Sequence, residues 1–108
     1  MTDEFTDFPI DFKSDIESPQ DRYYVEVEDS LRALAKGHTD ITGAMARLAR
    51  PAEGRSTTPL YEANITVYSR PQHINATEKA DDPMKAIQNA LRAVERQVRE
   101  KRARLRGH

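Results

Sequence analysis

Hydrophobic and polar residues alternate along four stretches of the chain, and this period of two predicts strands with one buried face. The clearest stretch is LYEANITVYS at 60–69, in which Tyr61, Ala63, Ile65 and Val67 alternate with polar residues. The other three are FPIDFKSDI at 8–16, ITGAMARLAR at 41–50 and HINATE at 73–78. Turn-forming segments alone separate the three strands from residue 41 onward, so we expect them to pair as antiparallel neighbours.

Between the first two strands, hydrophobic residues recur at helical spacing. Ser18-Pro19 is a helix-start signal, because serine caps unpaired backbone N–H groups and proline suits the first helical position. Gly37 follows as a stop signal. The residues expected on the buried side of this helix are Tyr24, Val27, Leu31 and Leu34.

A second helix is predicted after Asp82-Pro83, which repeats the combination of a capping residue and a proline. Its hydrophobic residues fall within a stripe about 80° wide at 100° per residue. These residues are Met84, Ile87, Leu91, Val94, Val98 and Leu105. Each of the two predicted helices has one hydrophobic side, and the predicted sheet has one hydrophobic face. The helices can therefore cover that face.

The predicted order of elements is therefore β-α-β-β-β-α. The simplest architecture is an α+β fold, in which a four-stranded sheet carries both helices on one face. The chain has 108 residues, the size of one domain. We expect an acidic, flexible leader over 1–7 and a single domain over 8–106.

Composition excludes several classes of chemistry. The chain has no cysteine, which rules out disulfides and cysteine-based zinc sites. Its three histidines are isolated, and no nucleophile–base arrangement or glycine-rich phosphate loop is present. We therefore expect that the protein is not an enzyme and that it binds no metal, no cofactor and no small-molecule substrate. With no signal peptide and no long apolar run, the expected location is cytoplasmic, without a membrane partner.

Charge is separated along the chain, although the formal net charge is only −1. Residues 1–31 contain ten acidic and two basic residues, whereas residues 32–108 contain eight acidic and fifteen basic residues. Such asymmetry suggests a polyanionic partner for the basic part. From charge alone, an equally good interpretation is that the acidic and the basic parts are two solvated surfaces that keep the protein in solution.

The basic residues of the second helix form a row beside its hydrophobic stripe. Lys85, Arg92, Arg96, Arg99 and Arg106 share one side of the helix, over a length of about 30 Å. Arginine suits phosphate oxygens, so this row is a candidate nucleic-acid contact. The alternative is a helix that carries charge for solubility, with cations favoured near its C-terminus. A further base, Arg47, is expected on the side of its strand opposite Ala44, Ala46 and Leu48.

Three segments together resemble the ribosome hibernation-promoting factor family, also called sigma-54 modulation proteins. They are DITGAMARLAR, LYEANITVYSRPQHINATE and DDPMKAIQNALRAVERQVREK. Within the last segment, the family pattern corresponds to Asp81-Asp82, Ala86-Ile87, Ala90, Arg96-Gln97 and Lys101. The resemblance covers most of residues 8–105.

The resemblance implies a protein that binds ribosomal RNA of the small ribosomal subunit, in the channel for messenger and transfer RNA. There it would block translation during stress or stationary phase and protect the idle ribosome. The resemblance also adds Lys101 and Arg102 to the basic row. The first helix departs from the family, because acidic residues outnumber its bases. The complete set of expected RNA-binding residues is Lys85, Arg92, Arg96, Arg99, Lys101, Arg102, Arg106 and Arg47.

A rival interpretation is a non-catalytic protein-interaction module that has lost ribosome binding. In that case an edge strand would pair into a homodimer, or the acidic N-terminal half would bind a basic partner. The sequence favours a monomer.

Overall fold

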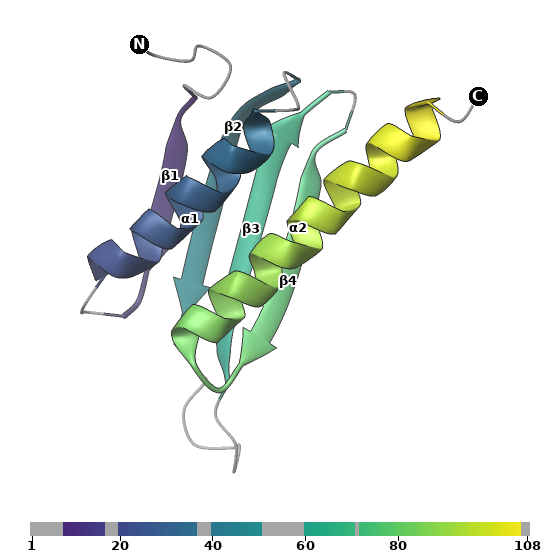
Figure 1. Cartoon of the computed structure of the whole chain (residues 1–108). Coiled ribbons are helices and arrows are strands. Elements are labelled where there is room, and N and C mark those ends of the chain that lie inside the picture. Colours follow the sequence, from purple (N-terminus) through teal and green to yellow (C-terminus); the bar gives the residue numbers. More distant parts are fainter. Residues whose placement is uncertain (1–7, 17–19, 37–39, 51–59, 71, 107–108) are drawn as a thin grey trace.

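Four strands and two helices follow one another in the order β-α-β-β-β-α, as the sequence predicts (Figure 1). The computed structural model describes residues 8–16, 20–36, 40–50, 60–70 and 72–106. The elements are β1 (Ile10–Ser14), α1 (Gln20–Ala35), β2 (Ile41–Ala49), β3 (Tyr61–Ser69), β4 (Ile74–Ala80) and α2 (Pro83–Arg106). The expected leader 1–7, the capping pair Ser18-Pro19 and the stop signal Gly37 lie outside the described residues.

The sheet has the strand order β1-β2-β3-β4, and both helices cover the same face (Figure 1). β1 is parallel to β2, because α1 carries the chain back along the sheet before β2 begins. β2, β3 and β4 are antiparallel neighbours, as expected. The predicted α+β class, with two helices on one face of a four-stranded sheet, is confirmed.

α1 buries a side that differs slightly from the expected one. Its buried residues recur every four positions, at Tyr23, Val27, Leu31 and Ala35. Val27 and Leu31 match the prediction, but Tyr24 and Leu34 are only half-buried. The ring of Tyr24 instead packs edge-on against Phe12 of β1, with the ring centroids 6.1 Å apart. Spacing identifies the helix, but the buried residues also depend on where the helix axis lies over the sheet.

α2 buries most of the predicted stripe together with a row of alanines. Ile87, Leu91, Val94 and Val98 are at most 8% exposed. Met84 is half-buried, and the side chain of Leu105 lies outside the described residues. The buried alanines are Ala86, Ala90 and Ala93. Their small side chains leave room for the helix to approach β3 and β4 closely.

The face of the sheet away from the helices, here called the open face, is polar. The strand register places Lys13, Arg47, Asn64 and Thr77 in one row across it. The amide of Asn64 donates to the side-chain oxygen of Asn75 at 3.3 Å. The open face therefore holds Arg47 on the side of the sheet opposite α1 and α2.

Candidate nucleic-acid interface

The capping signal predicted for the second helix is confirmed at the start of α2. The carboxylate Oδ2 of Asp82 accepts a hydrogen bond from the backbone N–H of Lys85 at 3.0 Å. Its backbone carbonyl accepts the N–H of Ala86 at 3.0 Å. From this point α2 continues for 24 residues, a length of about 36 Å. One side of such a helix can display several side chains in a long row.

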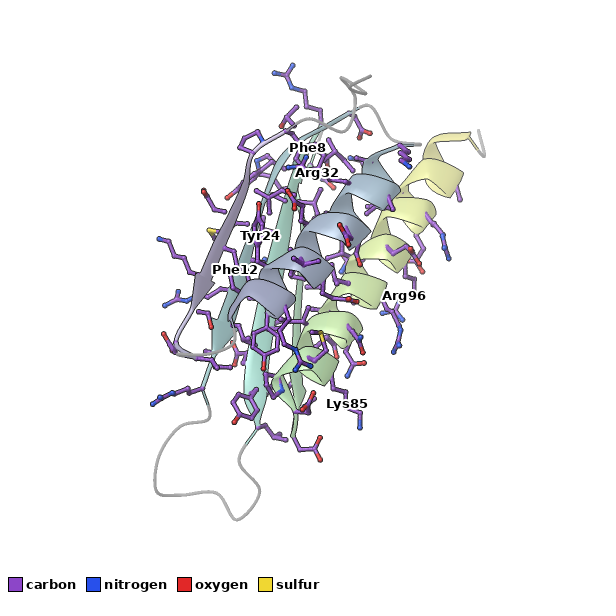
Figure 2. The ribbon with its side chains drawn as sticks, turned by 60° about the vertical axis from the view of Figure 1, so that its left-hand side comes forward. Phe8, Phe12, Tyr24, Arg32, Lys85 and Arg96 are labelled. Atoms are coloured by element: carbon purple, nitrogen blue, oxygen red, sulfur yellow. The ribbon has the colours of Figure 1, made fainter. Side chains whose placement is uncertain are left out.

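Four basic side chains form that row, which we call the cationic row: Lys85, Arg92, Arg96 and Arg99. All four are exposed. Figure 2 shows Lys85 and Arg96 extending outward from α2, away from the sheet. The hydrophobic side of α2 is held against β3 and β4, so the neighbouring side with these cations must face solvent. The structure thus groups four of the eight expected residues on one surface.

Contacts within the protein occupy the cationic row only in part. Nη2 of Arg99 lies 2.9 Å from Oε1 of Glu95, one turn earlier in α2. The Arg99 side chain is nevertheless 71% exposed, and ion pairs in such positions are weak and easily exchanged. Arg92 donates to the side-chain oxygen of Asn89 at 3.4 Å, a neutral partner. Within the described ranges, Lys85 and Arg96 form no ion pair.

The other expected bases do not extend this row in the part of the chain that the structure describes. Arg47 is exposed on the open face, on the far side of the sheet. Alternation along β2 dictates this position, because Ala46 and Leu48 on either side point toward the helices. Arg102 and Arg106 continue α2, but their side chains lie outside the described residues.

Lys101 is directed inward rather than along the cationic row. Its side chain is 16% exposed and ion-paired to Asp40 at 3.4 Å. It follows Ile87 and Val94 at intervals of seven residues, so it lies on the buried side of α2. This spacing is the sequence signal that could have separated Lys101 from the exposed bases.

α1 presents acidic groups beside the cationic row. A groove of about 220 Å³ between the two helices is lined by residues that include Glu26 of α1 and Arg92 and Glu95 of α2. Hydrophobic side chains of Leu31, Leu34 and Leu91 also line it. Arg92 therefore belongs to the cationic row and also borders the groove, whereas Lys85, Arg96 and Arg99 do not line the groove.

Arg32, one of the bases of α1, is engaged in a cluster with the first strand. It donates to Oε2 of Glu28 at 3.1 Å and to the backbone carbonyl of Phe8 at 3.2 Å (Figure 2). Tyr24 also donates to Glu28, at 3.2 Å. Burial and then this hydrogen bond raise the pKa of Tyr24, because both disfavour the phenolate beside a carboxylate. The cluster links α1 to the start of the sheet.

No group of three histidine, aspartate or glutamate side chains is arranged to hold a metal ion among the described residues. No helix within the same residues is long and apolar enough to cross a membrane.

The sequence model of the family described as Sigma 54 modulation protein / S30EA ribosomal protein matches residues 16–106. No curated protein matches the sequence.

Solved structures with the same fold include the following two. A ribosomal subunit interface protein from Coxiella burnetii superimposes with a TM-score of 0.69 at 17% identity, and the match covers 89% of this chain and 99% of that chain. The N-terminal domain of protein Y from Thermus thermophilus superimposes with a TM-score of 0.61 at 22% identity, over 86% of this chain and 94% of that chain. At these identities the likeness establishes the fold alone.

Proposed function

The chain belongs to the Sigma 54 modulation protein / S30EA ribosomal protein family, and on this basis we propose that it is a non-catalytic ribosome hibernation factor. It binds ribosomal RNA of the small subunit in the channel for messenger and transfer RNA. Translation stops because a folded domain in this channel excludes both RNAs. The observation that carries the proposal is the cationic row, four exposed bases on one side of α2.

The dimensions of the row suit an RNA backbone. Lys85 and Arg99 are fourteen positions apart, which corresponds to about 21 Å along a helix. That distance spans several phosphates of a nucleic-acid strand. Three of the four bases are arginines, whose planar guanidinium groups bind phosphate oxygens through paired hydrogen bonds. Both the spacing and the chemistry therefore support phosphate contacts along α2.

The acidic groups of α1 restrict how the RNA approaches. Glu26 and Glu95 line the groove between the helices, and their carboxylates repel a phosphate backbone. An RNA strand is therefore directed to the outer side of α2 instead of lying across both helices. In this proposal the chain binds RNA mainly through one helix.

Sedimentation with purified small ribosomal subunits tests the proposal. We expect the protein to pellet with the subunits at low salt and to be released as salt rises, because phosphate contacts displace condensed counterions. For four contacts, the slope of log affinity against log salt should be about −3. Transfer RNA and messenger RNA bound beforehand should prevent the association.

Large ribosomal subunits serve as the control for general RNA affinity. If the protein failed to associate with small subunits at any salt concentration, the proposal would be rejected. Simultaneous binding of the protein and transfer RNA would reject the proposed position in the channel while leaving ribosome binding intact.

A further inference from the structure

We propose that Lys101 is a positioning residue, which holds the C-terminal half of α2 against the end of the sheet and so fixes the direction of Arg96 and Arg99. Its ammonium group does not contact RNA. The effect on RNA affinity rests on the function proposed above, whereas the effect on α2 does not.

The Lys101 ammonium group finds all of its hydrogen-bond acceptors within the protein. Nζ donates to the backbone carbonyl of Arg70 at 2.7 Å and to Oγ of Ser69 at 3.2 Å. The carbonyl of Gln72 and Oδ2 of Asp40 each lie 3.4 Å away. An ammonium group has three donors, so these acceptors are sufficient for all of them. Three of the four belong to the end of β3 and the turn before β4.

The position of Lys101 explains why a charged residue occurs on the buried side of a helix. Ile87 is 1% exposed and Val94 is fully buried, and both lie on the same side of α2 as Lys101. At Lys101, α2 has reached the end of the sheet, beside the turn between β3 and β4 (Figure 1). There its ammonium group meets two backbone carbonyls, the Ser69 hydroxyl and the Asp40 carboxylate, and a long amphipathic side chain can reach them from the buried side of α2.

A second contact, one turn earlier, acts in the same way. The side-chain amide of Gln97 donates to the backbone carbonyl of Asn75 in β4 at 3.0 Å. We call Gln97 and Lys101 together the α2 anchor. Two attachments on successive turns resist both rotation of α2 about its axis and separation of its end from the sheet.

The direction of the cationic row depends on that rotation. Arg96 directly precedes Gln97, and Arg99 is two positions before Lys101. One position corresponds to about 100° around a helix, so the anchored side chains and the two arginines necessarily point in different directions. With the α2 anchor intact, the helix holds the two arginines toward solvent before any RNA is bound. Binding then costs less conformational entropy, because this part of α2 is already ordered.

The variant Lys101→Met tests the inference, because methionine keeps the apolar stem and the helix propensity but removes the donors. In the free protein, backbone amides of residues 97–101 should exchange with solvent about tenfold faster or more, since a charge-assisted set of hydrogen bonds is lost. Affinity for small ribosomal subunits should fall by about threefold or more. The slope of log affinity against log salt should stay unchanged, because no phosphate contact is lost.

Arg99→Met is the matched control. This variant removes an exposed cation two positions away, so its salt slope should decrease in magnitude by about one, with normal amide exchange. Gln97→Met should accelerate exchange in the same region as Lys101→Met, and it supplies the test if Lys101→Met does not fold.

The outcomes are distinct. A reduced salt slope with normal exchange in Lys101→Met would mean that Lys101 binds phosphate, and the inference would be overturned. Unchanged exchange in both anchor variants would also overturn it. Failure of the wild-type protein to bind small subunits would refute the proposed function, whereas amide exchange in the free protein would still decide whether the α2 anchor exists.

Discussion

The double variant Arg96→Glu/Arg99→Glu is expected to lose affinity for small ribosomal subunits by about a hundredfold or more at moderate salt. Two phosphate contacts are removed and two repulsive charges replace them. Both side chains are exposed, so the fold should persist. The cost is small: the Arg99–Glu95 ion pair is lost, and new carboxylates stand one turn from Glu95 and from Glu100 on α2. Equilibrium binding to fluorescently labelled subunits provides the measurement.

The matched control is Lys13→Glu/Arg47→Glu, which makes the same change of charge on the open face. These two residues are register partners in β1 and β2, on the side of the sheet away from α2. We expect this variant to bind with less than about a threefold loss, because only long-range electrostatics change. Equal losses in the two double variants would show that net charge, rather than the cationic row, determines binding.

The largest expected effect on stability comes from Leu48→Ala in the central strand β2. Leu48 is 1% exposed and among the largest fully buried side chains. Truncation leaves a cavity between the sheet and the helices and should lower the free energy of unfolding by about 2–5 kcal/mol. For a domain with a total of about 5–15 kcal/mol, this is a large fraction.

Leu60→Ala is the same substitution at a position that is 40% exposed. Its cost should be smaller, about 1 kcal/mol or less, because much of the side chain stays in water after folding and its removal leaves no enclosed cavity. Urea unfolding of both variants measures the difference. Similar losses at the two positions would contradict the assignment of Leu48 to the core.

Period-two and helical patterns are sufficient to predict every described element. Even β2 follows from its pattern, although alanine is a poor strand former. Its alanines are tolerated because Ala44 and Ala46 face the helices and are buried. Patterning cannot specify which neighbouring residue of α1 enters the core, since Tyr23 and Tyr24 are equally hydrophobic and only the packing of α1 distinguishes them.

The candidate interface is predictable only in part. A helical wheel correctly places Arg92, Arg96 and Arg99 on one exposed side, because the hydrophobic stripe determines which side of α2 faces solvent. Lys101 is grouped with these arginines because of its residue type and the family resemblance. However, it follows Val94 by seven residues, and this interval places it on the buried side of α2. Its partners come from the turn after β3 and from Asp40, far away in the sequence. Contacts of this range do not follow from local spacing.

Arg47 illustrates a different limit. Its predicted position opposite Ala46 and Leu48 is observed. The separation of Arg47 from the basic helix follows from this position together with the arrangement of both helices on one face of the sheet, which is observed as predicted. Grouping Arg47 with the bases of α2 by residue type alone overlooks the combination of these two predictions.

A cryo-electron-microscopy reconstruction of the protein bound to the small ribosomal subunit would show directly whether α2 contacts RNA. We expect density for the domain in the channel for messenger and transfer RNA, with the outer side of α2 against ribosomal RNA. Arg92, Arg96 and Arg99 should lie within hydrogen-bonding distance of phosphate oxygens, and Lys101 should keep its contacts with the turn after β3. A bound domain whose α2 faces solvent, with the open face against the RNA, would refute RNA binding through the cationic row.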